Sequence, residues 1–327
     1  MDKPLFSFCI LTYNQVNTVE ESIASALAQT YSPLEIIISD DCSSDETWEI
    51  INRTVSNYHG PHSIVLNRNE KNMGIAAHCS KVFRQLSRGE WIIGAAGDDV
   101  YMPNRCDDIY DAWKKTNFTA TVAINGVTTL DIHSGVITQN HNADRFFTIK
   151  DFIHSCAFAG AGCASAYHRS VFNKFPPLAT QSLEDRPLHF RGLLCGGIIY
   201  TQKIGVLYRI TGNNVSISAD PLKNKRKRHV FTLESTAQHY LDLAYALSEN
   251  MISESEFISL CQAIQKMYKR QMSRNLIIHI PLSQRIKFLF SSLLSFESWC
   301  INLLAIILPE CMYNLLKRIK SKIHSNR

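Results

Sequence analysis

The feature that most constrains the fold is the alternation, over the first hundred residues, of apolar runs with segments of helical periodicity. In one such segment Val19, Ile23 and Leu27 recur at helical spacing behind the capping pair Thr18 and Glu21. Strands that alternate with helices form βαβ units in a parallel sheet. These residues therefore predict a doubly wound half-domain, with strands at residues 6–12, 34–39, 63–67 and 91–96.

After the first hundred residues the rhythm changes. Further strands are predicted at residues 120–127, at 136–138, and near Ala164 and Ile198. From Phe231 onward the pattern is helical, with a capping box at Ser253 and Glu256. We expect an α/β domain over residues 1–225, with halves at 1–100 and 101–225, a helical C-terminal region over 226–327, and a mobile loop near 218–228.

The composition is that of an ordinary globular protein, because 45% of the 327 residues are apolar and 19% are charged. It excludes disorder, collagen and coiled coil as descriptions of the whole chain. The ten cysteines are scattered without a Cys-X-X-Cys motif, which favours reduced thiols in a cytosolic protein. The first residues lack the features of a signal peptide, so we expect the folded body to stay in the cytoplasm.

Charge is distributed unevenly along the chain. Residues 266–327 carry 11 Lys and Arg and 2 acidic residues, a net charge of +9, whereas the remainder carries −4. The longest uncharged apolar stretch of this tail, 298–309, is shorter than the ~20 residues that span a membrane. Cations interleaved with apolar residues favour an amphipathic helix on the membrane surface over nucleic-acid binding. Packing on the body or in a homo-oligomer is the alternative.

Polar residues follow each of the four predicted parallel strands, where an open sheet binds its ligands. Asp98 and Asp99 are adjacent carboxylates at one strand end, and they repel each other unless a cation or a set of donors neutralises them. Oxygen ligands of this kind suit Mg²⁺ or Mn²⁺. The candidate residues at the other strand ends are Thr12, Tyr13, Asn14, Asp40, Asp41, Arg68 and Gly74.

Five segments, in order, resemble the motifs of the inverting family 2 glycosyltransferases, which have the GT-A fold. They are FSFCILTYN, EIIISDDCSSDET, NEKNMGIAAHCSKVF, GEWIIGAAGDDVYMP and SLEDRPL. The resemblance covers residues 5 to about 216 and implies a Rossmann-like, doubly wound mixed sheet. It also implies a nucleotide-sugar donor, in the first place a UDP-sugar, whose diphosphate lies on a divalent metal, Mn²⁺ or Mg²⁺.

The resemblance assigns roles to individual positions of this chain. It places Thr12, Tyr13 and Asp41, with Asp40 beside them, at the base and ribose of the nucleotide. Asp98, next to Asp99, takes the metal position, while Ala96 replaces the family's first metal-motif acid. Asn14, Arg68 and Gly74 are assigned to the donor site, as are Arg209 and Asn213, which resemble a loop that closes over the diphosphate.

Transfer requires a base for the acceptor hydroxyl, and the resemblance places Asp185 in that role with Glu184 beside it. The alternative is that Ser182 and Asp185 form only a capping box at the start of a helix. Small residues at Gly160 and Gly162 would permit close approach of a sugar.

Two other functions have less support in the sequence. A dinucleotide-dependent dehydrogenase is disfavoured because no Gly-X-Gly-X-X-Gly follows the first strand. A non-catalytic nucleotide-sugar-binding partner of a membrane-associated transferase complex is favoured only by Ala96. The resemblance implies transfer of a hexose or N-acetylhexosamine to a polyprenyl-diphosphate-linked saccharide, in O-antigen or capsule synthesis. The enzyme would then lie peripherally on the inner face of the cell membrane.

Overall fold

The computed structural model describes residues 2–140, 143–158, 160–179, 184–211 and 221–276. Predictions that concern Asn213, Ser182 and the basic tail from residue 277 onward lie outside the described residues. In the described part, no helix combines the length and the apolar character needed to cross a bilayer.

The strands form one mixed sheet. They are β1 Phe6–Thr12, β2 Leu34–Asp40, β3 Ser63–Arg68, β4 Trp91–Ala96, β5 Val100–Tyr101, β6 Val122–Asp131, β7 Ile137–Asn140, β8 Arg145–Phe147, β9 Ser165–His168 and β10 Ile198–Ile210. Their order in the sheet is β3-β2-β1-β4-β9-β6-β10-β5, with β7 paired to β6 and β8 to β10. The first four strands are parallel, and β9 runs antiparallel to both β4 and β6.

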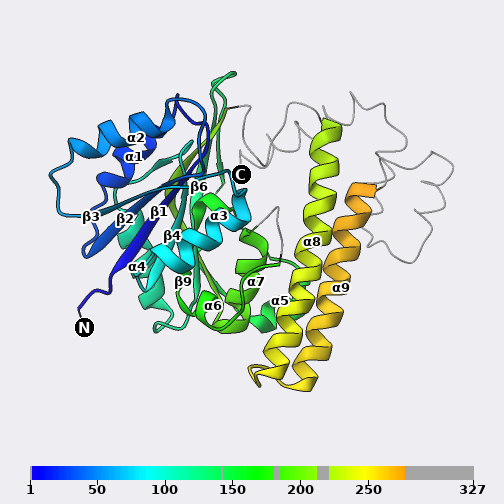
Figure 1. The fold of residues 1–327 in the computed structure, drawn as a ribbon. Helices are drawn as coiled ribbons and strands as arrows, with labels where there is room; N and C mark the ends of the chain where they lie inside the picture. The colour runs from blue at the N-terminus through cyan, green and yellow to red at the C-terminus, as the bar shows by residue number, and fades with distance from the viewer. Residues whose placement is uncertain (1, 141–142, 159, 180–183, 212–220, 277–327) are drawn as a thin grey trace.

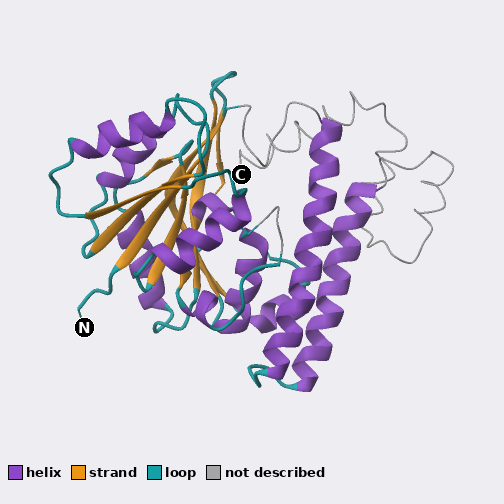
Figure 2. Cartoon of the chain, viewed as in Figure 1, coloured by secondary structure: helices purple, strands orange, loops and turns teal. Residues whose placement is uncertain are grey.

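Helices cover both faces of this sheet (Figure 1, Figure 2). They are α1 Val19–Leu27, α2 Thr47–Ser56, α3 Ile75–Lys81, α4 Arg105–Lys115, α5 Ile149–Ser155, α6 Ser170–Asn173, α7 Asp185–Cys195, α8 Pro221–Ser248 and α9 Glu254–Leu276. A π-helical turn, η1 (Val82–Leu86), follows α3, and a 3₁₀ turn, η2 (Gly162–Ala164), precedes β9. The long helices α8 and α9 lie side by side and contact the body through α7 and α5.

The four strands predicted in the first hundred residues are confirmed, with end points that differ by at most one residue. All residues of β1 and β2 are buried, as expected for strands covered by helices on both faces. An aromatic cluster fixes the base of this half, where the Phe6 and Tyr31 rings stack with centroids 4.2 Å apart. The sheet thereby gives the following loops a rigid support.

Three predicted details of the helix ends had different outcomes. The capping box at Ser253 is confirmed, because its N–H lies 2.9 Å from Glu256 Oε2, while the Glu256 N–H donates to Ser253 Oγ. The pair at Thr18 is wrong as a capping box, since Thr18 makes no side-chain cap and Glu21 instead pairs with Arg209. The loop predicted near 218–228 is wrong from Pro221 onward, where α8 begins and runs through the expected boundary at 225. Proline is well tolerated in the first turn of a helix.

The chain leaves the parallel half of the sheet immediately after β4. It turns through residues 97–99 and forms β5, which pairs antiparallel with β10 through Tyr101 and Val206. The Tyr101 hydroxyl donates to the Ala96 carbonyl at 2.8 Å, and its buried ring packs against Phe8. This crossover places Asp98 and Asp99 at the junction between the two halves of the sheet.

Candidate active site

A cavity of about 1240 Å³ opens at the carboxyl ends of β1 and β4. Pockets for one drug-sized ligand span about 300–1,000 Å³, so this cavity has room for more than one molecule. The predicted site residues that line it are Thr12, Tyr13, Asn14, Asp41, Gly74, Asp98, Asp99, Glu184 and Asp185. Asp40, Arg68 and Arg209 instead contact the loops that line it.

Asp41 organises one wall of the cavity through hydrogen bonds that its carboxylate accepts. Oδ1 accepts from Asn69 Nδ2 at 2.8 Å and from the Met73 N–H at 2.9 Å, and Oδ2 accepts from the Gly74 N–H at 3.0 Å. Gly74 has a φ of +78°, a conformation that glycine adopts without strain. The Asp41 side chain, only 3% exposed, therefore holds the loop between β3 and α3 in place.

The end of β1 contributes Thr12, Tyr13 and Asn14 to the same wall. Asn14, with a φ of +51°, donates its N–H to Ser43 Oγ and accepts from the Ser44 N–H, both at 2.9 Å. These bonds join the loop after β1 to the loop after β2. Tyr13 is 46% exposed and presents an aromatic surface at the mouth of the cavity.

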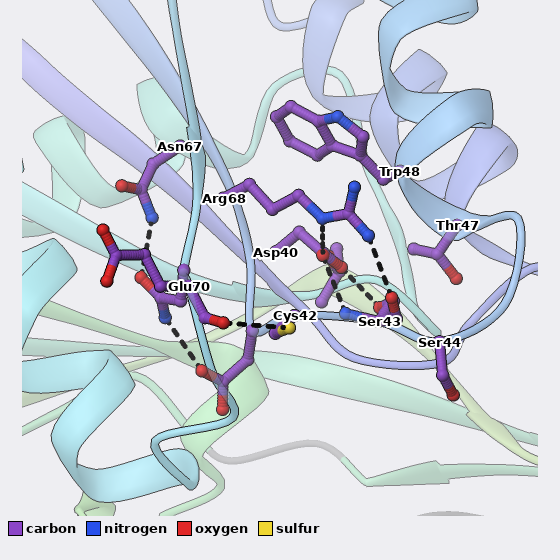
Figure 3. Close-up of polar contacts among 12 residues, drawn as sticks. Asp40, Cys42, Ser43, Ser44, Thr47, Trp48, Asn67, Arg68 and Glu70 are labelled. Carbon is purple, nitrogen blue, oxygen red and sulfur yellow. Dashed lines mark hydrogen bonds and ion pairs between the residues drawn. The ribbon is translucent and has the colours of Figure 1, made fainter.

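Asp40, at the end of β2, and Arg68, at the end of β3, contact each other and the loop after β2 (Figure 3). The fully buried Asp40 carboxylate accepts from the Ser43 N–H at 2.9 Å and from the Thr12 and Ser43 hydroxyls. Arg68 Nε lies 3.5 Å from Asp40 Oδ2, and its Nη2 donates to the Ser43 carbonyl at 3.0 Å. The guanidinium also lies over the Trp48 ring. Both residues are thus engaged in shaping the loop after β2.

The acidic turn after β4 is held by Arg209 of β10. Arg209 Nε donates to the Asp98 carbonyl at 2.6 Å, and its backbone N–H donates to Asp99 Oδ1 at 3.1 Å. Its guanidinium also bonds to Glu21 and to the Thr18 carbonyl of the α1 N-terminus. Arg209 therefore joins the crossover strand, the acidic turn and α1 in one network.

Two observations fit a divalent cation at this turn. Asp99 Oδ2 is buried and has no hydrogen-bond partner among the described residues. Burial and, after it, the adjacent Asp98 raise the pKa of Asp99 to about 8 although Arg209 and Arg105 lower it, so a cation bound here would stabilise the ionised carboxylate. The described residues hold no cluster of three or more His, Cys, Asp or Glu side chains arranged for a metal. An ion bound to Asp98 would therefore need further ligands from a diphosphate and water.

On the other side of the cavity, Glu184 and Asp185 mark the start of α7. Glu184 is the N-cap residue and Asp185 the first helical residue, so Asp185 does not occupy the third position that a capping box with Ser182 requires. Asp185 Oδ1 accepts from the Arg186 N–H at 2.7 Å. Burial and the charge of Asp185 raise the pKa of Glu184 to about 7.

The structure also brings residues into the cavity that the sequence did not single out. His78 of α3 lies at its edge, and its Nε2 is hydrogen-bonded to the Ser39 hydroxyl at 2.7 Å. Asn125 of β6 also lines the cavity. Asn125 had a signal in the sequence, since it is a polar residue inside the apolar run 120–127. No sequence pattern marks His78 as a site residue, and only its residue type could have suggested a role.

The model of the family described as glycosyl transferase family 2 matches residues 7–175, which is half of the chain. The chain belongs to glycosyl transferase family 2. It is 25% identical over 285 residues to an uncharacterized glycosyltransferase of Rickettsia prowazekii, covering 80% of this chain and 86% of that protein. Over 101 residues it is 34% identical to an Escherichia coli protein, WfaP, named as a UDP-Glc:alpha-D-GlcNAc-diphosphoundecaprenol beta-1,3-glucosyltransferase. That match covers 31% of this chain and 38% of WfaP.

Solved structures of other proteins show the same fold. Staphylococcus aureus TarS (1–349) in complex with UDP-GlcNAc superposes with a TM-score of 0.52 at 15% identity, covering 86% of this chain and 83% of that one. The mannosyltransferase PcManGT from Pyrobaculum calidifontis, in complex with GDP-Man and Mn²⁺, gives 0.53 at 14% identity, covering 99% and 86%. The predicted GT-A fold with C-terminal helices is therefore confirmed.

Proposed function

We propose that this protein transfers a hexose or N-acetylhexosamine from a UDP-sugar to a hydroxyl of a lipid-linked saccharide, with inversion at the anomeric carbon. The observation that carries the proposal is that one cavity contains Asp41, Asp98 and Asp185, which come from three separate motifs. The name of the E. coli relative, which prints a UDP-glucose donor and a diphosphoundecaprenol-linked acceptor, supports this choice of substrates.

In this reaction the bond from the acceptor oxygen to the anomeric carbon forms while the bond from that carbon to the diphosphate breaks. Asp185 takes the proton of the acceptor hydroxyl, and UDP leaves with the electron pair of the broken bond. A direct displacement with one base and no covalent intermediate inverts the anomeric configuration. Asp41 and the loop that it fixes bind the nucleotide, with the Tyr13 ring beside the base.

Asp98 would hold the divalent cation, and the chemistry that such an ion would supply there is neutralisation of negative charge on the diphosphate leaving group. The Arg209 network keeps the acidic turn at a fixed distance from α1 and β10. The cavity is large enough for donor and acceptor together, which transfer without a covalent intermediate requires. In this proposal Asp98 acts on the leaving diphosphate, and Asp185 acts on the acceptor hydroxyl, which is the nucleophile.

The alternative, a non-catalytic nucleotide-sugar-binding partner, is supported by Ala96 at the position of the family's first metal-motif acid. In the structure Ala96 contributes backbone groups, since its carbonyl accepts from the Tyr101 and Ser22 hydroxyls. One experiment separates the two functions. Purified protein is screened with a panel of nucleotide sugars and a lipid-linked acceptor, and UDP release is measured for wild type and Asp185→Asn. If wild type binds a nucleotide sugar but releases no UDP when the acceptor is added, the protein is the non-catalytic binding partner.

We also propose that the enzyme acts peripherally at the inner face of the cell membrane, bound through its basic tail. The tail's net charge of +9 supports this, since each cation near an anionic surface contributes about 1 kcal/mol. Deleting residues 283–327 should reduce sedimentation with anionic vesicles and slow transfer to a lipid-linked acceptor. Transfer to a short soluble acceptor should change much less. Full-length protein that ignores anionic vesicles at low salt would contradict the proposal.

A further inference from the structure

One polar side chain that lines the cavity has no hydrogen-bond partner in the described part of the chain. Asn125 lies in β6 and is only 1% exposed, yet it is one of the residues that line the cavity. Neither its Oδ1 nor its Nδ2 has a hydrogen-bond partner among the described residues. A buried amide without partners costs free energy, so such a group is retained where a ligand or a bound water satisfies it.

A glycine on the neighbouring strand leaves room for this amide. A Cβ atom added to Gly205 of β10 would lie 2.6 Å from Asn125 Cγ and 3.0 Å from Oδ1. Any side chain at 205 would therefore displace the amide. The Gly205 carbonyl accepts from the Met102 N–H at 3.0 Å, which ties this part of β10 to the crossover after the acidic turn.

The 3₁₀ turn η2 lies next to the proposed base and lines the same cavity as Asp98. A Cβ atom added to Gly162 of η2 would lie 3.3 Å from Asp185 Cβ, so η2 contacts the proposed base directly. The next residue, Cys163, has its carbonyl bound by Arg105 Nη2 at 2.9 Å. Cys163 lines the cavity together with Asp98 and Asp185.

Direct displacement requires the anomeric carbon to lie between the diphosphate near Asp98 and the acceptor oxygen near Asp185. Because Gly162 of η2 and Asn125 of β6 line the same cavity as Asp98 and Asp185, we place the sugar ring of the donor beside them. In that position Gly162 and Ala164 offer no polar side chains, whereas Asn125 offers an amide donor and an amide acceptor.

We propose that Asn125 is a specificity-determining residue, which hydrogen-bonds a hydroxyl or acetamido group of the sugar being transferred. This inference rests on the proposed function and adds the group that recognises the sugar. An amide can accept from one hydroxyl and donate to its neighbour, so it distinguishes sugars by the positions of those groups. A site with a buried, otherwise unpaired amide strongly disfavours a sugar that lacks the matching group.

The test compares the affinities of UDP, UDP-glucose and UDP-N-acetylglucosamine for wild type and Asn125→Ala, measured by calorimetry with Mn²⁺ present. We expect wild type to bind one UDP-sugar more tightly than UDP, and Asn125→Ala to lose about tenfold in affinity for that sugar. Affinity for UDP should stay within twofold. Asn52→Ala is the matched control, because Asn52 is an exposed asparagine on α2, outside the cavity.

A second variant tests the geometry independently of Asn125 itself. Gly205→Ala should displace the amide and reproduce the loss of sugar affinity, and the double variant should be no worse than Asn125→Ala alone. If Asn125→Ala does not fold, Asn125→Ser and Gly205→Ala supply the same comparison.

The possible failures are distinguishable. An unchanged ratio of UDP-sugar to UDP affinity in the variants, with a lower melting temperature, would show that Asn125 binds only a structural water, and would overturn this inference alone. Equal losses of UDP and UDP-sugar affinity would overturn it as well. A wild type that binds none of the three compounds would contradict the proposed function and this inference together.

Discussion

The cavity has a nucleotide end, around Asp41, and a transfer end, around Asp98, Asp99, Asn125 and Asp185. The two ends differ in whether the protein itself provides hydrogen-bond partners for their buried polar groups. At the nucleotide end, the Asp41 carboxylate accepts bonds from Asn69, Met73 and Gly74, so the protein itself satisfies it. At the transfer end, Asp99 Oδ2 and the amide of Asn125 are buried without partners among the described residues. The nucleotide end is therefore organised before any ligand arrives, whereas the transfer end is completed by what binds there.

This difference has an energetic meaning. Hydrogen bonds that shape the nucleotide end contribute to folding, so substitutions there should lower stability as well as binding. Unpartnered and mutually repelling groups at the transfer end cost stability and are retained for function, so substitutions there should remove activity and leave the fold intact. The following experiments test whether the two ends separate in this way.

The largest effect is expected at Asp98. Asp98→Ala should lower turnover by about 10⁴-fold, because the leaving diphosphate loses the carboxylate proposed to hold its cation. Steady-state kinetics with excess Mn²⁺ should show little rescue. The melting temperature should stay equal or rise, since one of two repelling carboxylates has been removed. Full activity of wild type in EDTA would show that the reaction does not use a cation at Asp98.

Asp185→Asn should lower turnover by about 10³-fold, because the amide keeps the shape of the side chain but accepts no proton. Its affinity for the donor, measured by calorimetry, should match that of wild type. Acceptor-independent hydrolysis of the donor serves as the internal control. Near-normal transfer by this variant would leave Asp185 with only its bond to the Arg186 N–H at the start of α7.

Asp41→Ala should act mainly on the fold. It leaves the N–H groups of Met73 and Gly74 and the Asn69 amide without their acceptor, which should cost about 3 kcal/mol of unfolding free energy. Urea unfolding of Asp41→Ala beside Asp98→Ala makes the comparison directly. Equal stability of the two variants would contradict the division between the two ends of the cavity.

Most of the nucleotide end could be predicted from the sequence, because it depends on local patterns. The apolar runs fixed β1 to β4, and parallel strands bring Thr12, Asp41 and Asp98 to one edge of a sheet. The transfer end depends on contacts between distant segments. The pairing of β5 with β10, and the bonds from Arg209 to the acidic turn and to α1, join residues more than a hundred positions apart. No periodicity specifies such contacts.

Contacts between distant segments also account for the details that sequence patterns predicted wrongly or left open. Glu21 has the spacing of a capping box with Thr18, yet its carboxylate pairs with the buried guanidinium of Arg209 from β10 instead. Asn125 was visible as a polar residue in an apolar run, but its meaning depends on Gly205, which is distant in sequence. The domain boundary near residue 225 stays a prediction, with α8 continuous across it.

The smallest effect concerns the pH dependence of stability at Glu184, whose pKa is raised from 4.5 to about 7 by burial and by Asp185. A carboxyl with a raised pKa binds its proton more tightly in the folded state, so between pH 4.5 and 7 the folded protein holds more protons than the unfolded chain. The sign of the linkage then makes stability fall as pH rises through this window. Because the side chain is only partly buried, we expect a contribution of about 2 kcal/mol instead of the full value.

Glu184→Gln carries no titrating group, so its unfolding free energy in urea should fall less than that of wild type between pH 5 and pH 8. Asp41→Ala, at the other end of the cavity, should keep the wild-type slope. Parallel pH profiles for wild type and Glu184→Gln would show that Glu184 is ionised in the folded protein throughout this range. The pKa of Glu184 would then not be raised by folding.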